Sequence, residues 1–188
     1  RSSSAASDVY KRQVSNCIDL ENCLISLGDT LSVIAIASSL TSDDISIEEY
    51  EWISSIDGLV SSSLNLSTTD LSLGSHTLTF RAKNSVGFWS ANASLSIVVN
   101  AVPTIELDSI NPNPVIAGEE SQITVTGLDE DENDILTFFW STDSVTLFND
   151  ENKALFSTQS TDQGDHIISV YAEDSKGAKS NVPVSYTH

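Results

Sequence analysis

The chain of 188 residues contains no methionine, two cysteines and only eight basic side chains. Because 27 Asp and Glu residues stand against those eight Lys and Arg residues, the formal net charge is −19. A nucleic-acid-binding surface needs a basic face to neutralise phosphates, and anionic lipid attracts basic segments. The charge therefore argues against both partners. No apolar run reaches the roughly 18 residues that a membrane span needs.

The two ends of the chain differ from the rest. Translation begins with methionine, so its absence indicates an internal piece of a longer protein. Residues 1–14 carry three of the eight basic side chains and show no strand-like alternation, so we expect a disordered or artefactual tail there. This stretch and the closing residues 184–188 resemble translated sequencing-adapter sequence at the ends of metagenomic reading frames. The alternative is an ordinary disordered terminus.

One stretch of the sequence occurs twice, with a step of 90 residues between the copies. It covers residues 74–87 and 164–177, and the same step relates His76 to His166. Each copy consists of a glycine turn, an alternating strand and a polar turn closed by glycine. An internal repeat of this length indicates two copies of one small domain.

The remainder of each copy consists of short apolar or alternating segments separated by turn signals. No helical period is present, and turn residues recur about every 8–12 positions. A strand with a tryptophan, Trp52 or Trp140, precedes the repeated stretch in both copies. We therefore predict an all-β chain of two tandem immunoglobulin-like β-sandwiches with about seven strands each, over residues 15–100 and 101–188.

The order of these segments resembles a known family. A Trp-bearing strand is followed by a Gly-x-His strand that ends in Asn84-Ser85-Val86-Gly87 or in Asp174-Ser175-Lys176-Gly177. This order resembles the polycystic-kidney-disease (PKD) type and related bacterial and archaeal immunoglobulin-like domains, although the Trp-Asp-Phe-Gly-Asp-Gly motif of the PKD type is absent. The resemblance implies a non-enzymatic extracellular module, used in tandem as a spacer, an adhesive or a substrate-binding accessory.

An acidic loop at residues 129–134 is the sharpest candidate site. Alternate oxygen-bearing side chains in such a loop can converge on one hard cation, which takes six to eight oxygen ligands. The turn after the repeated strand would lie at the same end of a sandwich and add one more carboxylate. The candidate Ca²⁺ ligands are Asp129, Asp131, Asn133, Asp134 and Asp174. The alternative is a solvated acidic loop that binds no ion. In the first repeat the matching positions hold fewer candidate ligands, Asp43, Asp44 and Asn84, and we expect no metal there.

Catalytic chemistry is not indicated by the remaining polar residues. His76 and His166 occupy equivalent positions in phase with inward-facing residues, so we expect them at the rim of each core. No Gly-x-Ser-x-Gly nucleophile elbow is present, although serine is abundant. The sequence therefore predicts a protein that is not an enzyme.

The two cysteines, Cys17 and Cys23, lie six residues apart before the first main strand. In an extracellular chain such a pair suggests a disulfide that closes a small loop. The spacing alone is not a metal motif, because four ligands are not at hand. The alternative is two free thiols.

Two functions from different classes fit the sequence. The first is a spacer or adhesion segment of a larger secreted or surface protein, with neighbouring domains of the same chain, a cell-surface protein or a glycan as partners. The second is a carbohydrate- or polymer-binding accessory region of a secreted hydrolase, because sugars stack on flat exposed rings. Phe88 and Trp89 are the main candidates for stacking, together with Phe139 and Tyr171. The alternative for these rings is packing against neighbouring strands.

Overall fold

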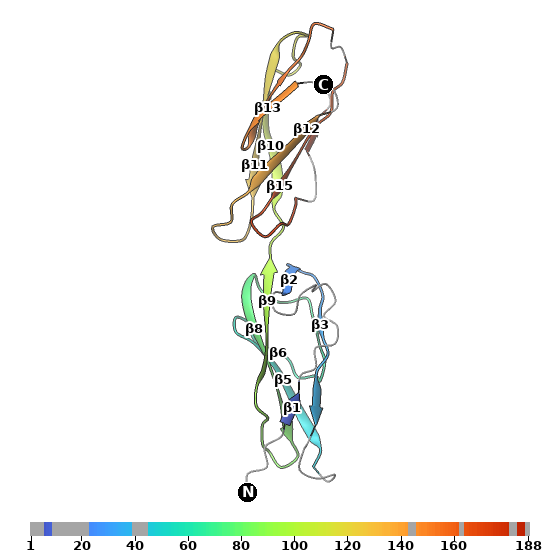
Figure 1. The fold of residues 1–188 in the computed structure, drawn as a ribbon, viewed down its shortest axis with the longest axis vertical. Helices are drawn as coiled ribbons and strands as arrows, with labels where there is room; N and C mark the ends of the chain where they lie inside the picture. The colour runs from blue at the N-terminus through green and yellow to red at the C-terminus, as the bar shows by residue number, and fades with distance from the viewer. Residues whose placement is uncertain are drawn as a thin grey trace. The chain divides into compact units, whose positions relative to one another are not determined.

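The computed structural model describes residues 6–8, 23–38, 45–142, 146–161, 164–180 and 184–186. The chain divides into two compact units, Arg1–Asn100 and Ala101–His188. The regular elements of the described residues are all β-strands, shown in Figure 1 in blue to green for unit 1 and in yellow to red for unit 2. Among these residues no helix is long and apolar enough to cross a membrane.

Unit 1 is built around a sheet with the strand order β2-β9-β8-β5-β6. The pairs β1–β4 and β3–β7 form two further short sheets. Within the large sheet β2 runs parallel to β9, and the other neighbours are antiparallel. The strands are β1 (Ala6–Asp8), β2 (Cys23–Ser26), β3 (Leu31–Val33), β4 (Ile36–Ser38), β5 (Ile47–Ser54), β6 (Gly58–Ser61), β7 (Leu66–Thr68), β8 (Gly74–Asn84) and β9 (Ala93–Asn100).

Strand β8, the repeated stretch, shows why these residues form a sandwich. Its side chains alternate, so His76, Leu78, Phe80 and Ala82 are buried while the residues between them are half-buried or exposed. Trp52 on β5 packs against Phe80 with ring centroids 4.8 Å apart. The apolar face of the large sheet packs against the apolar side chains of β3 and β7, and together they form one core.

Unit 2 has two sheets, with the strand orders β10-β11-β14-β13 and β12-β15-β16. A sandwich of four strands on three is the arrangement of constant-type immunoglobulin domains. Its core consists of Val115, Ile123, Val125, Phe156, Ile168 and Val170, with Trp140 packed against it. The strands are β10 (Thr104–Asn111), β11 (Glu120–Leu128), β12 (Thr137–Thr142), β13 (Thr146–Asp150), β14 (Lys153–Ser157), β15 (Ile168–Glu173) and β16 (Val184–Tyr186).

The repeat extends to individual hydrogen bonds at the end of the repeated strand. The Ala82 amide donates to Ser90 Oγ at 3.1 Å, and 90 residues later the Ala172 amide donates to Ser180 Oγ at 3.2 Å. In the turn itself, the Asn84 amide donates to the carbonyl of Phe88 at 3.0 Å. In unit 2 the Asp174 amide donates to the carbonyl of Ala178, also at 3.0 Å. The two units therefore share the repeated strand and its turn, although their sheets differ in strand order.

Parts of both chain ends pair with the units. Strand β1 lies within the stretch that we expected to be a tail, and it pairs with β4. Strand β16 lies within the closing residues and pairs with β15. The other residues of 1–14 and of 181–188 lie outside the described residues.

Candidate functional site

Three segments meet at the end of unit 2 where the chain enters it. The loop between β11 and β12 holds the acidic residues, the turn at 174–178 follows β15, and the entering chain begins at Ala101. Asp131 Oδ2 accepts a hydrogen bond from the Ala101 amide at 3.0 Å. Asp134 Oδ1 accepts one from the Ser175 amide at 3.1 Å. The acidic loop thus bonds both to the entering chain and to the turn.

Three of the predicted carboxylates converge. Asp129, Asp131 and Asp134 each place one oxygen within 4.8 Å of the others. The side chains of Asp131 and Asp134 are 10% and 2% exposed. Asp129 Oδ1 accepts the Asp131 amide at 2.8 Å, whereas the buried Oδ2 finds no hydrogen-bond partner in the described part of the chain.

A lysine that the sequence analysis did not single out lies at this cluster. Lys176 Nζ is 3.1 Å from Asp131 Oδ2 and 2.9 Å from Asp134 Oδ2. Val86 is the residue at the matching position of the first repeat. That difference between two otherwise similar turns is the signal by which Lys176 could have been found.

The charges of the cluster shift its ionisation. Hydrogen bonds from Ser175 and Lys176 hold the pKa of Asp134 well below its ordinary value, although burial acts in the opposite direction. The bond to Asp134 raises the pKa of Lys176. Burial, with the neighbouring carboxylates as a smaller cause, raises the pKa of Asp129. Asp134 and Lys176 therefore form a firmly charged pair, and Asp129 is the least readily ionised member.

Asp174 is placed differently from the converging carboxylates. It is 6% exposed, and its Oδ1 accepts the Lys176 and Ala178 amides at 2.9 and 2.7 Å. Asn84 does the same in unit 1, where its Oδ1 accepts two amides of its own turn at 3.1 and 2.9 Å. Because an uncharged amide fills the same role, this oxygen of Asp174 stabilises the turn. Its role as a metal ligand stays a prediction.

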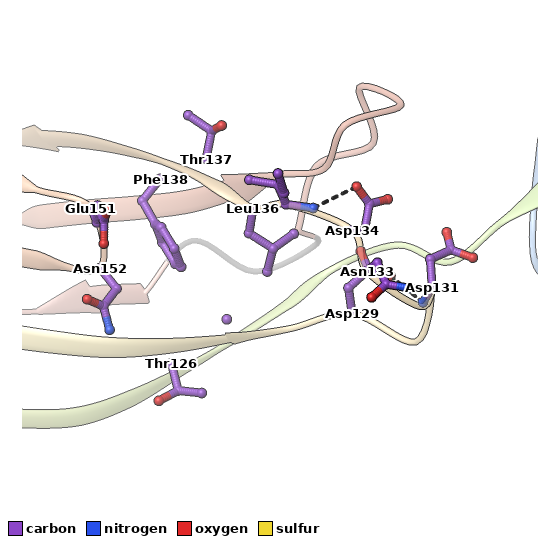
Figure 2. A pocket seen from close by; sticks show the side chains of 12 residues that line it. Thr126, Asp129, Asp131, Asn133, Asp134, Leu136, Thr137, Phe138, Glu151 and Asn152 are labelled. Carbon is purple, nitrogen blue, oxygen red and sulfur yellow. Dashed lines mark hydrogen bonds between the residues drawn. The ribbon is translucent and has the colours of Figure 1, made fainter.

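A cleft of about 900 Å³ adjoins the acidic loop. Figure 2 shows the acidic residues at one end of the cleft and Glu151 and Asn152 at the other. A Cβ atom on Gly127 would lie 2.8 Å from both Leu136 Cδ1 and Phe138 Cζ, so these side chains pack directly on the glycine backbone. The lining residues are Thr126, Gly127, Asp129, Asp131, Asn133, Asp134, Ile135, Leu136, Thr137, Phe138, Glu151 and Asn152.

His76 of unit 1 belongs to a buried polar network rather than an open site. Its Nδ1 lies 2.8 Å from Ser54 Oγ, and its Nε2 lies 2.7 Å from the carbonyl oxygen of Ser72. Because a carbonyl only accepts, Nε2 carries a proton and donates to it. Ser54 Oγ also accepts the Ile56 and Asp57 amides at 3.1 and 3.0 Å. The network holds the β5–β6 hairpin against β8, and the side chain of this histidine is fully buried.

The candidate stacking rings are partly covered. Arg81 lies over the ring of Trp89, 4.3 Å from its centroid, so one face of that ring is occupied. Phe88 is 47% exposed. Phe139 and Tyr171, a cross-strand pair on β12 and β15, stack on each other with centroids 4.9 Å apart and an angle of 11°. Phe139 is the more open ring of that pair, at 40% exposed.

Two predictions fall partly outside the described residues. Cys23 is fully buried and is not a free thiol, but Cys17, the other cysteine of the sequence, is not described. The pairing of the two therefore stays a prediction. Asp43 and Asp44, at the matching positions of the first repeat, also lie outside the described residues.

The fold is shared with solved structures of tandem domains. The N-terminal eight immunoglobulin domains of the Down Syndrome Cell Adhesion Molecule, isoform 1.30.30, match 90% of this chain at 16% identity with a TM-score of 0.56. This chain covers 26% of that one. The chain is a tandem pair of immunoglobulin-like β-sandwiches. Identity at this level shows the fold alone.

Two other similar structures come from microbial and viral proteins. The fibronectin(III)-like modules of Clostridium thermocellum CbhA are 21% identical, with 93% of this chain and 92% of that chain covered and a TM-score of 0.38. Three N-terminal domains of the bacteriophage RB49 Highly Immunogenic Outer Capsid protein are 12% identical, with coverage of 97% and 68% and a TM-score of 0.48. No protein-family model and no curated protein sequence matches the chain.

Proposed function

We propose that the chain is a non-catalytic spacer or adhesion segment of a larger secreted or cell-surface protein. The observation that carries this proposal is the presence of two immunoglobulin-like sandwiches in tandem, which share the repeated strand and the hydrogen bonds at Ser90 and Ser180. Units that repeat a scaffold extend a chain by fixed steps and need no chemistry of their own.

The buried serine–histidine pair of unit 1 also supports a non-catalytic role. A serine nucleophile must reach its substrate, and its base must be free to take the proton. Ser54 is 2% exposed and its oxygen already accepts two backbone amides. His76, also 2% exposed, is held through both ring nitrogens.

The pairing of the terminal strands suits a segment that carries tension. In unit 1 the early strand β2 lies parallel to the last strand β9, from Cys23↔Ile97 to Ser26↔Asn100. Tension on the two ends of such a unit pulls these strands past each other, so all their hydrogen bonds are loaded together. In unit 2 the described strands β10 and β16 pair with β11 and β15 respectively.

The second candidate function is a carbohydrate-binding accessory region, and the stacked pair Phe139 and Tyr171 favours it. Affinity electrophoresis through gels that contain soluble polysaccharides separates the two functions. A spacer migrates at the same rate in every gel. Retardation that is lost in Phe139→Ala and kept in Phe148→Ala, an exposed phenylalanine on β13, would support the accessory function instead.

The parent gene supplies a second discriminating observation. Further copies of the 90-residue repeat beside this segment support the spacer, and an adjoining hydrolase domain supports the accessory function. The calcium site that the sequence predicts in the acidic loop stays a prediction. To bind there, calcium would have to displace the ammonium group of Lys176 from Asp131 and Asp134.

A further inference from the structure

The ammonium group of Lys176 lies against carboxylates that the sequence analysis named as candidate metal ligands. It contacts Asp131 and Asp134, two of the three carboxylates that converge in the acidic loop. Those two residues also accept the Ala101 and Ser175 amides. We propose that Lys176 is a tethered counter-ion, which holds the acidic loop, the 174–178 turn and the entering chain together without a metal and keeps divalent cations out.

The first repeat separates this role from a role in forming the turn. Val86 stands at the position of Lys176, and it is 57% exposed. The turn around it nevertheless makes the same hydrogen bonds, with the Gly87 amide donating to the Asn84 carbonyl at 2.9 Å and Gly177 to Asp174 at 3.2 Å. The turn therefore needs no lysine. The side chain of Lys176 instead forms ion pairs with Asp131 and Asp134.

The tether gives the lysine an advantage over a dissolved ion. Because the ammonium group is covalently tethered, its effective concentration at the carboxylates is high. A divalent cation would have to displace it, and the protein would lose the two ion pairs with Asp131 and Asp134. Removal of the lysine charge would leave converging carboxylates with no cation among them, and like charges at this distance repel. A hard divalent cation is the group that carboxylates in this arrangement would then take up.

The test is amide hydrogen exchange by NMR on the full chain, with and without calcium. The wild-type chain is compared with Lys176→Val, the residue of the first repeat, with Lys176→Arg, and with Lys179→Val. Lys179 is the matched control because it lies in the same segment but pairs with Glu173. The amides of Ala101 and Ser175 report on the site. Calcium chloride at about 10 mM is compared with sodium chloride of equal ionic strength.

The proposal makes a distinct prediction for each chain. In sodium chloride, Lys176→Val exchanges the two reporter amides roughly fivefold faster than wild type, the factor that corresponds to an ion pair of about 1 kcal/mol. Calcium slows that exchange again by roughly tenfold, for a site with a dissociation constant near 1 mM. Wild type, Lys176→Arg and Lys179→Val exchange slowly and do not respond to calcium.

Three results would overturn the proposal. Calcium that protects the reporter amides of the wild-type chain would show that a metal displaces the lysine. Wild-type exchange rates in Lys176→Val would show that the lysine does not hold the three segments together. Exchange in Lys176→Val that does not respond to calcium would show that the lysine does not exclude divalent cations. If Lys176→Val loses protection throughout unit 2, Lys176→Gln, which retains the chain length and polarity, takes its place in the same comparison.

Discussion

Replacement of Ser54 by alanine should destabilise unit 1 strongly, because one hydroxyl serves four groups. Its oxygen accepts the Ile56 and Asp57 amides, lies 2.8 Å from His76 Nδ1 and contacts an Asp57 carboxylate oxygen at 3.4 Å. A buried polar group left without its partner costs about 1–3 kcal/mol. In Ser54→Ala, the buried Nδ1 of His76 and the amides of Ile56 and Asp57 would all lose their hydrogen bond to the Ser54 hydroxyl.

We expect Ser54→Ala to lower the free energy of unfolding of unit 1 by about 2–4 kcal/mol, the cost of one fully buried and two partly buried orphaned groups. For a domain of this size that corresponds to a fall in Tm of roughly 10–20 °C. Urea unfolding followed by resolved NMR signals of each unit measures the change. Unit 2 should be unaffected.

Unit 2 offers a matched control at the corresponding position. Ser54 pairs with Leu78 on β8, and Thr142 pairs with Ile168 on β15. Ile168 lies 90 residues after Leu78, so Thr142 occupies the position in unit 2 that Ser54 occupies in unit 1. The buried hydroxyl of Thr142, however, finds no hydrogen-bond partner in the described residues. Thr142→Val should therefore leave the stability of unit 2 unchanged or raise it by about 1 kcal/mol. A Ser54→Ala variant that unfolds within about 0.5 kcal/mol of wild type would refute the reasoning.

Three further outcomes are expected. Burial would raise the pKa of Asp57, but bonds from Ser72 and the charge of His76 outweigh it and leave that pKa below its ordinary value. The resulting stabilisation is complete above about pH 4 and is lost as the pH falls towards the folded-state pKa. Between about pH 7 and pH 3, the free energy of unfolding measured with urea should therefore fall less in Asp57→Asn than in wild type. An equal fall in the two chains would contradict this. Gly127→Ala should cost about 1–3 kcal/mol in unit 2, measured by thermal unfolding, because its Cβ would meet Leu136 and Phe138; an unchanged Tm would contradict it. Because the net charge is −19, the Tm should rise between 10 and 500 mM sodium chloride as self-repulsion is screened, and a fall would contradict that account.

The strands and the repeat could be predicted because they depend on local pattern. Alternation on β8 predicted that His76, Leu78, Phe80 and Ala82 face inward, and all four are buried. The prediction of an all-β tandem fold is confirmed. The signal was strong because each copy repeated the same turn residues at the same spacing.

The details of the sites could not be predicted to the same degree because they depend on side chains that are distant in sequence. Lys176 reaches carboxylates more than 40 positions earlier in the chain, and no local pattern records such a contact. The partners of His76 were also missed, since Ser54 becomes its neighbour only through the register of β5 on β8. For Asp174 a signal existed, because Asn84 at the matching position indicates a turn-stabilising oxygen.

Single-molecule pulling on the full chain tests the central claim, that this is a tandem of independent load-bearing sandwiches. The account predicts two separate unfolding events, each releasing on the order of 300 Å of chain at about 3.5 Å per residue. Because β2 and β9 are parallel, the event of unit 1 should need the higher force. A single event that releases both units together, or a continuous extension without force peaks, would contradict the claim.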